Sequence, residues 1–562
     1  MTINNFPYIR FIIATEVLAA QTTKYKFCKN KLLGFYLFHK IKKYLEFINH
    51  ISTMRNLYGT NIATMAGSLI NYRTKQILYC AGFAAMVLAS SCKKNGFDKL
   101  SESDEPTAEV AFDINNITDT YANIARAGNS RNWGPYNVHD PSIFKDGEWF
   151  YCYSTDVGYG VEVRAGIQIR KSKDLVNWQF VGWVFNGLPP ISDSYIKNNG
   201  AVSNAGIWAP YVLKAGNEYR LYYSLASTGF RISCIGLATA SSPEGPWVEK
   251  GIAVGSVTNG PGTNAIDPTV TVTPSGEHYM VYGSAWDGLF EVKLNPATGL
   301  ASTEKDQGNR IIRRGSTNGV YNGNLEGPEI IYNQDTKMYY LFVAYDWIDT
   351  KYNVRVFRST NPTGPFLDWN GRNADLPEDH GPMILSPYRF MEHGGWAGVS
   401  HPSVFQDNGQ FFIATQGRPG VDRAFMVLHV RKIFWTPEGW PVVSPERYAN
   451  VAEEAVTKEQ IAGNYEQIVL GYVTVPGYSA EQTDPNYSTA STTVLSADGR
   501  INGDANNTWS YTAPWLELRW GGFFVDKLHV SRERDWEKKV PSTIVMSGFN
   551  GGGTAIWFKK IQ

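Results

Sequence analysis

The sequence predicts an all-β protein, a five-bladed β-propeller followed by a small antiparallel β-barrel or sandwich. Three observations carry this prediction. A strand opened by a proline recurs five times between residues 128 and 445, at intervals of roughly 60 to 75 residues, which suits four-stranded blades with loops. Each copy passes through a short polar turn into a second strand, usually rich in aromatic residues. After residue 455, alternating apolar segments predict a second β domain.

The first copy shows the motif most clearly. Asp140-Pro141-Ser142-Ile143-Phe144 is followed by the turn Lys145-Asp146-Gly147 and the aromatic run at 149–154. A proline is tolerated at the start of a strand because the first positions need not donate to the ladder. In a propeller, the residues that open these strands lie at the mouth of the central channel. The five openings are Asp140, Ala209 (with Trp208 beside it), Asp267, Glu326 and His401.

The second β domain is expected at residues 455–562, after a link around residues 446–460. Turns at 497–499 and 550–553, both containing glycine, favour antiparallel hairpins. The expected strands are 467–475, 492–495, 515–520, 527–530, 543–546 and 555–558.

The N-terminal part has the pattern of an export signal. Arg73 and Lys75 precede an apolar run at 77–89, small residues and Cys92, as in a bacterial lipoprotein signal peptide whose cysteine is lipid-modified. We therefore interpret residues 1–91 as a mis-started upstream segment plus a signal peptide, with Met54 or Met65 as the initiator. A genuine basic extension is the alternative. Residues 92–127 are polar and form an expected tether.

Composition limits the possible partners. The 562 residues include 52 Lys+Arg and 52 Asp+Glu, and this balance, without a basic tract in the body of the chain, gives no reason to expect nucleic acid. Aromatic residues make up 14% of the chain, and flat rings suit stacking on sugars. Within the predicted propeller, Cys152 and Cys234 lie in apolar strand segments, where buried free thiols are expected rather than a disulfide.

An ordered series of motifs resembles glycoside hydrolase family 43, within its endo-α-1,5-L-arabinanases, over about residues 130–445. The region from about Gly463 resembles the β-barrel domain of the extracellular two-domain members. The motifs are Val138-His139-Asp140-Pro141-Ser142, Gly206-Ile207-Trp208-Ala209-Pro210, Ile266-Asp267-Pro268, Tyr282-Gly283-Ser284-Ala285-Trp286-Asp287-Gly288, Leu325-Glu326-Gly327-Pro328 and Ser400-His401-Pro402-Ser403-Val404.

The resemblance implies an inverting glycosidase that acts on arabinan or arabino-oligosaccharides. Inversion requires a carboxylate base and a carboxylic acid on opposite faces of the scissile bond. By the resemblance, Asp140 is the base, Glu326 is the acid, and Asp267 orients this acid and raises its pKa. His401 is the one protein ligand of a hydrated calcium ion, and no organic cofactor is implied. Trp208, Ser284 and Trp286 line the sugar cleft.

Several alternatives remain open at the level of sequence. Asp140 and Asp267 could each cap a turn, Glu329 could replace Glu326 as the acid, and His401 and Trp286 could be structural. The enzyme could be an exo-acting α-L-arabinofuranosidase or β-xylosidase, or the propeller could only bind glycans at the cell surface. The expected location is the outer membrane, through the lipid anchor alone, on either the surface or the periplasmic face. The oligomeric state is not predicted.

Overall fold

The computed structural model describes residues 111–119, 127–157, 163–260 and 262–561, all within one compact unit, Glu105–Gln562. Cys92 and the expected signal segment lie outside these residues. No helix in the described ranges is long and apolar enough to span a membrane. The short helices are η2 (Ile114–Asn116), η3 (Ala127–Asn132), α4 (Pro190–Asn198) and α5 (Lys458–Ile461).

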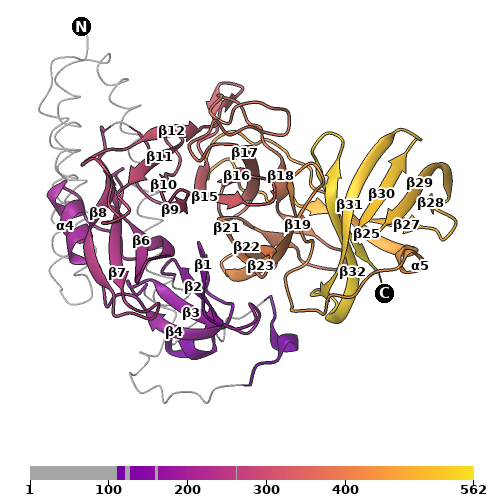
Figure 1. Cartoon of the computed structure of the whole chain (residues 1–562), viewed down its shortest axis with the longest axis horizontal. Helices are drawn as coiled ribbons and strands as arrows, with labels where there is room; N and C mark the ends of the chain where they lie inside the picture. Colours follow the sequence, from indigo (N-terminus) through magenta and orange to yellow (C-terminus); the bar gives the residue numbers. More distant parts are fainter. Residues whose placement is uncertain (1–110, 120–126, 158–162, 261, 562) are drawn as a thin grey trace, which may run out of the picture. The chain divides into compact units, whose positions relative to one another are not determined.

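Four separate antiparallel sheets, each of four strands in sequence order, follow one another along the chain (Figure 1). Sheet I contains β1 (Ser142–Asp146), β2 (Trp149–Ser154), β3 (Gln168–Ser172) and β4 (Gln179–Trp183). Sheet II contains β5 (Trp208–Ala215), β6 (Glu218–Ala226), β7 (Ser233–Ala240) and β8 (Val248–Ser256). Sheet III contains β9 (Thr269–Val272), β10 (His278–Tyr282), β11 (Leu289–Leu294) and β12 (Asn309–Ile312). Sheet IV contains β15 (Leu325–Asn333), β16 (Met338–Tyr345), β17 (Asn353–Ser359) and β18 (Met383–Leu385).

A fifth sheet, sheet V, is larger because segments from elsewhere join it. Its strands β21 (Ser403–Asp407), β22 (Gln410–Pro419), β23 (Val427–Trp435) and β24 (Pro441–Val443) pair antiparallel in sequence order. The short strands β20 (Trp396–Ala397), β19 (Tyr388–Arg389) and β26 (Ser488–Thr489) extend it to seven strands. A separate small hairpin consists of β13 (Ser316–Thr317) and β14 (Val320–Tyr321).

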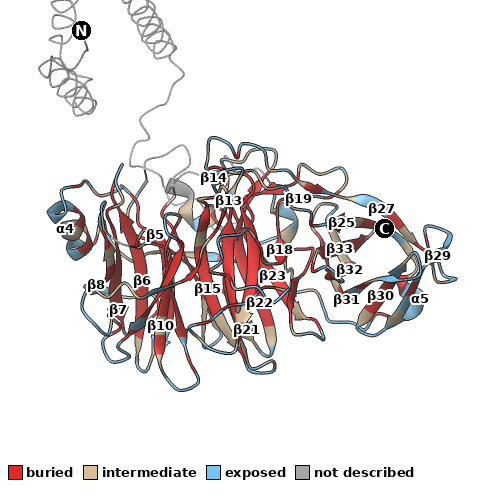
Figure 2. Ribbon diagram, turned by 90° about the horizontal axis from the view of Figure 1, so that it is seen from above, coloured by how far each residue is buried: buried red, intermediate tan, exposed pale blue. Residues whose placement is uncertain are grey.

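The first strands of the sheets contact one another around a common axis. β1 contacts β5 and β21, β9 contacts β5 and β15, and β15 also contacts β21. The strands are largely buried, and the exposed residues gather in the loops and in α4 (Figure 2). The prediction of a propeller is confirmed with four distinct blades, sheets I to IV. Sheet V differs from a simple blade because other segments extend it.

The C-terminal strands form a closed eight-stranded antiparallel barrel, so the structure selects the barrel of the two predicted options. Its strands are β25 (Gly463–Val469), β27 (Ser491–Leu495), β28 (Arg500–Ile501), β29 (Asp504–Thr512), β30 (Trp515–Trp520), β31 (Phe524–Asp535), β32 (Val540–Asn550) and β33 (Ala555–Lys560). The segment expected to be a strand at 467–475 leaves the barrel after Val469.

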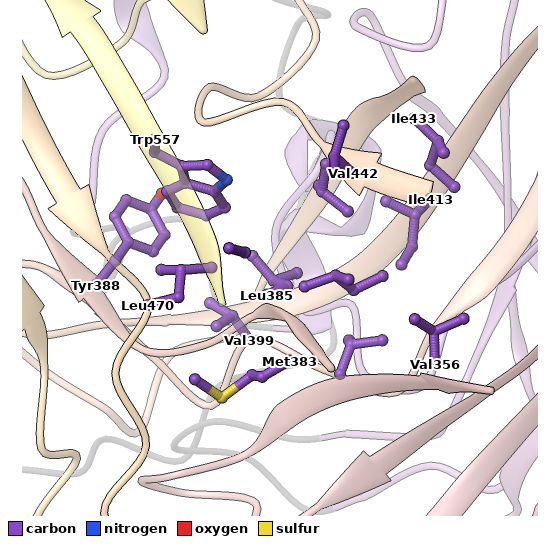
Figure 3. Close-up of a cluster of buried hydrophobic side chains, with 14 of the residues drawn as sticks. Val356, Met383, Leu385, Tyr388, Val399, Ile413, Ile433, Val442, Leu470 and Trp557 are labelled. Carbon is purple, nitrogen blue, oxygen red and sulfur yellow. The ribbon is translucent and has the colours of Figure 1, made fainter. Parts of the chain in front are cut away.

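One hydrophobic core joins the propeller and the barrel. Trp557 and Leu470 from the C-terminal part lie beside Tyr388 and the apolar side chains of β18, as Figure 3 shows. Tyr388, Leu470 and Trp557 are at most 2% exposed. Burying such aromatic and aliphatic side chains is worth about 1.5–3 kcal/mol each. The two domains are therefore fastened to each other. Cys152 and Cys234 are buried free thiols, as the sequence predicted.

Candidate active site

Each repeat holds the residue before its strand proline in the left-handed backbone region. This conformation is uncommon for residues other than glycine, and proline biases its predecessor toward extended conformations. Such outliers cost about 1–3 kcal/mol and concentrate at functional sites. The φ angles are 47° for Asp140, 36° for Ala209, 56° for Asp267, 54° for Gly327 and 59° for His401.

Sheet IV departs from the predicted alignment, because Gly327 and not Glu326 holds the left-handed position. Glu326 pairs with Ala344, and the ladder shifts between Glu326 and Glu329. β5 has the same kind of shift after Trp208, so Glu326 occupies the position of Trp208 in sheet II. A side chain at Gly327 would lie 3.0 Å from His401 Nδ1, which explains the glycine there.

Asp140 lies between two imidazoles and is 6% exposed. Its Oδ1 is 3.0 Å from His401 Nδ1, and its Oδ2 is 2.9 Å from His139 Nδ1. The Thr155 hydroxyl donates to Oδ2 at 2.6 Å. Burial alone would raise the pKa of Asp140, but the imidazoles of His139 and His401 hold it well below its ordinary value. Asp140 is therefore a carboxylate over the whole neutral range.

The other two acids lie together on the neighbouring strand openings. The hydroxyl of Ser284 donates to Glu326 Oε2 at 2.8 Å. The N–H of Gly327 donates to Asp267 Oδ2 at 3.2 Å. The pKa of Asp267 is raised well above its ordinary value, mainly by burial; the charge of His401 opposes this shift, and the charges of Glu326 and Asp140 add to it. Ser284, predicted to contact the sugar, also orients Glu326.

His401 and Tyr352 connect the three acids. Burial would lower the pKa of His401, but Asp140, Asp267 and Glu326 raise it to about 9. The Tyr352 hydroxyl lies 3.4 Å from His401 Nδ1. The pKa of Tyr352 is raised well above 10 by burial and by the same acids, so its phenol stays protonated. The sequence prediction missed Tyr352, because it lies in the turn between β16 and β17 with no motif around it.

Glu329, the alternative acid, has a different environment. It is 3% exposed, and its carboxylate accepts a hydrogen bond from the backbone N–H of Val404 in β21. Burial raises its pKa well above the ordinary value. Since this side chain is enclosed between two strands, it cannot reach a sugar, and Glu326 is the better candidate.

A cleft of about 760 Å³ is lined by Ala285, which follows Ser284 in the chain, and by Gly323, which lies just before the strand of Glu326. The sequence-predicted Trp286, 56% exposed, lines it together with Arg231, Tyr321, Tyr478 and Glu481. The half-buried Trp208, which opens β5, is not among its lining residues. Neither this cleft nor a smaller cavity of about 240 Å³, lined by residues such as Asp368, His380 and Tyr472, has any of the three acids among its lining residues.

The predicted calcium ion fits only as a largely hydrated ion. His401 offers a single nitrogen, whereas calcium prefers six to eight oxygen ligands. Among the described residues, the one cluster of three ligands that could hold a metal is Glu446, Asp535 and Glu537, where Lys559 lies 2.6–3.2 Å from all three acids. Of the predicted ligands, the protein therefore supplies only the imidazole nitrogen of His401 to an ion near Asp140.

The arrangement can perform acid–base chemistry on a neutral substrate. One carboxylate is held ionised by imidazoles, and a second is placed by a hydroxyl beside an open cleft with exposed aromatic rings. A carboxylate base and a carboxyl group held in place by a hydrogen bond are the two groups that such chemistry uses. A propeller with this site belongs to the class of glycoside hydrolases.

Comparison with known proteins gives the family. The profile of glycosyl hydrolases family 43 matches residues 134–441, more than half of the chain, and that of a C-terminal lipocalin-like domain matches residues 445–558. This chain belongs to glycosyl hydrolases family 43.

The matched relatives span most of the chain. An extracellular endo-alpha-(1->5)-L-arabinanase of Thermotoga petrophila is 27% identical over 474 residues, which cover 76% of this chain and 94% of the relative. Extracellular endo-alpha-(1->5)-L-arabinanase 2 of Bacillus subtilis is 28% identical over 469 residues, which cover 75% of this chain and 93% of the relative. The crystal structure of endo-1,5-alpha-L-arabinanase from Thermotoga petrophila RKU-1 superposes with a TM-score of 0.65 and 26% identity, covering 76% and 99% of the two chains.

Proposed function

We propose that this protein is an endo-acting arabinanase that hydrolyses internal α-1,5-L-arabinofuranosidic bonds with inversion. The observation that carries the proposal is the contrast between Asp140, whose pKa is lowered by His139 and His401, and Glu326, which is oriented by Ser284 next to the cleft-lining Ala285 and Trp286. The names of the endo-alpha-(1->5)-L-arabinanase relatives, which match this chain over almost their full length, supply the substrate.

In this mechanism Asp140 takes a proton from a water molecule, and the water oxygen attacks the anomeric carbon. Glu326 gives its proton to the glycosidic oxygen as the bond to the leaving sugar breaks. The pKa of Asp267 is raised, and its carboxyl group accepts a hydrogen bond from the N–H of Gly327. Through this bond Asp267 holds the start of the strand next to Glu326. Tyr352 keeps the ring of His401 in place between the acids.

A hydrated calcium ion at His401 belongs to the same proposal. When bound, it would supply positive charge near Asp140, with His401 as its only protein ligand. An ion there requires His401 to give up the proton that its raised pKa favours, so binding should weaken as pH falls below about 9. Calorimetric titration with calcium, after a chelator has removed bound metal from the protein, tests this expectation. Heat of binding that persists in His401→Ala would exclude His401 as the calcium ligand.

We assign β21 to β24 as the fifth blade. This assignment is supported by their antiparallel order, by the contacts of β21 with β1 and β15, and by the left-handed His401 before Pro402. The additional strands β19, β20 and β26 then form an extension of this blade toward the barrel.

The decisive experiment compares two substrates, linear arabinan and an aryl glycoside of arabinotriose. An aryl leaving group departs without a proton, so Glu326→Gln should lose about 10²–10⁴-fold in kcat on arabinan and much less on the aryl substrate. Asp140→Asn should lose a similar factor on both, because both need the base. Glu329→Gln is the matched control and should retain activity if it folds normally.

Product analysis distinguishes the mode of action. Short oligosaccharides of mixed length from debranched arabinan support endo cleavage, whereas arabinose alone would show an exo-acting enzyme. Unchanged hydrolysis of both substrates by Glu326→Gln would refute the assigned acid.

Export with a lipid anchor at Cys92 is the proposed location, supported by the basic and apolar pattern at 73–92. The relatives' names describe them as extracellular. Fatty-acid labelling of the intact protein but not of Cys92→Ser would support the anchor, and equal labelling would refute it.

A further inference from the structure

The chain between β25 and β26, residues 470–487, leaves the barrel and crosses to the propeller. We name this segment the cleft loop. Gly477 forms a parallel bridge with Asn322, just before β15. β26, which ends the loop, pairs parallel with β19 of sheet V. A segment of the C-terminal domain thus reaches the side of the propeller that carries Glu326.

The cleft loop is fastened to sheet IV by buried hydrogen bonds. Gln482 is 1% exposed, its Nε2 donates to Asp346 Oδ1 at 3.0 Å, and its Oε1 accepts from the N–H of Trp347 at 2.6 Å. The hydroxyl of Tyr472 donates to Asp346 Oδ2 at 2.8 Å. Buried, satisfied polar networks of this kind fix a single conformation. The cleft loop therefore forms an ordered wall of the cleft.

This wall presents an aromatic ring to the cleft. Tyr478 is 46% exposed, and its ring centroid lies 5.2 Å from that of Trp347. Glu481 accepts the N–H of Tyr478 at 2.8 Å, which holds the turn. Tyr478 and Trp286 line the same cleft. Partial burial, with Glu326 and Asp267 in smaller measure, raises the pKa of Tyr478 to about 12, so the ring lies within electrostatic reach of the acids.

The position of the cleft relative to Glu326 sets which part of the substrate it holds. Ser284, the partner of Glu326, is followed directly by Ala285 and Trp286, and Gly323 lies just before β15; these three residues line the cleft. A general acid protonates the oxygen of the leaving group. The cleft therefore adjoins the leaving side of the scissile bond.

We infer that Tyr478 of the C-terminal domain forms, with Trp286, a binding subsite for the leaving portion of the arabinan chain. The inference rests on the proposed function and adds to it that the C-terminal domain takes part in substrate binding. Exposed aromatic faces stack on the apolar faces of sugar rings, and the Tyr478 hydroxyl can also bond to a sugar hydroxyl.

The test compares Tyr478→Ala with the wild type on two substrates. Arabinohexaose places sugars on both sides of the cleaved bond, whereas an aryl glycoside of arabinotriose places only the aryl group on the leaving side. We expect kcat/KM to fall about tenfold on arabinohexaose, which corresponds to about 1.4 kcal/mol, and to change less than about twofold on the aryl substrate. Tyr478→Phe, which keeps the ring, should recover most of the loss.

Phe523→Ala serves as the matched control, because Phe523 is an exposed aromatic residue of the barrel that does not line the cleft. Phe523→Ala should have the same kcat/KM as the wild type on both substrates. Equal losses of Tyr478→Ala on both substrates, or no loss on either, would overturn the subsite. If the wild type hydrolyses neither substrate, the proposed function itself fails, and the subsite with it. Thermal unfolding of each variant confirms that the comparison is made on folded protein.

Discussion

At the scale of single residues, two aspartates in the same place of their repeats have opposite electrostatic properties. Asp140 and Asp267 both precede a strand proline and both have left-handed φ angles. The pKa of Asp140 is lowered by two imidazoles, whereas that of Asp267 is raised by burial and by neighbouring carboxylates. The sequence predicted both as site residues, but could not predict this difference, because it depends on which charged groups the fold brings near each carboxyl group, such as Glu326 near Asp267.

Glu291 offers a test of the electrostatics outside the active site. It lies in β11 and is 6% exposed, its Oε1 has no hydrogen-bond partner among the described residues, and burial raises its pKa to about 8. An acid with a raised pKa in the folded state makes the protein less stable as pH rises from about 4.5 to about 8. Glu291→Gln should therefore raise the free energy of unfolding at pH 9 by on the order of 2–4 kcal/mol, and so the melting temperature, and should raise both much less at pH 4.5.

The control for this prediction is Glu304→Gln, because Glu304 has a side chain that is 88% exposed. Its melting temperature should follow that of the wild type at both values of pH. A gain for Glu291→Gln of equal size at pH 4.5 and pH 9 would mean that packing and not ionisation is responsible.

At the scale of elements, the strands with strong motifs were predicted and the irregular ones were not. The paired openings β1–β2 and β21–β22 follow the expected turns. β29 was missed because its sequence, beginning at Asp504, is rich in asparagine, a residue that disfavours strands. Residues 470–475 were predicted to continue a barrel strand, since alternating apolar residues look the same whether they face their own barrel or a neighbouring domain.

The hydrogen bonds that hold the cleft loop against the propeller can be tested by mutation. Gln482→Ala removes hydrogen bonds to Asp346 and Trp347 and leaves their polar groups buried, which should lower stability by about 1–3 kcal/mol. The loop should also become more accessible to proteases. Limited proteolysis and thermal unfolding measure both effects.

Gln179→Ala, at an exposed position of β4, is the control and should change neither property. Cleavage of Gln482→Ala at the same rate as the wild type would show that the cleft loop is held mainly by its other contacts.

At the scale of the whole molecule, the propeller and the barrel share a core and a buried charge cluster. Lys559 of β33 bonds to Glu446, which follows the last propeller strand, and to Asp535 and Glu537 of the barrel. The three acids raise the pKa of Lys559 well above its ordinary value despite its burial, so it stays charged. The domains should unfold together.

Lys559→Met leaves three buried acids without their cation and should lower the stability by about 3–5 kcal/mol. The control is Lys527→Met, which removes an ion pair to Glu438 that also joins the two domains but has both side chains about half exposed. Exposed pairs contribute about 0–1 kcal/mol. Calorimetry should show one transition in the wild type. Equal effects of the two substitutions would contradict a special role of the buried cluster.

The sequence by itself determined the repeat, the class of fold and the residues that gather at the strand openings, because strand prolines, turns and aromatic runs are local signals. Only the tertiary structure decided that Gly327 and not Glu326 holds the left-handed position, that Asp140 is held ionised, and that the barrel contributes Tyr478 to the cleft. These properties depend on contacts between residues distant in the chain, and such contacts leave no local pattern.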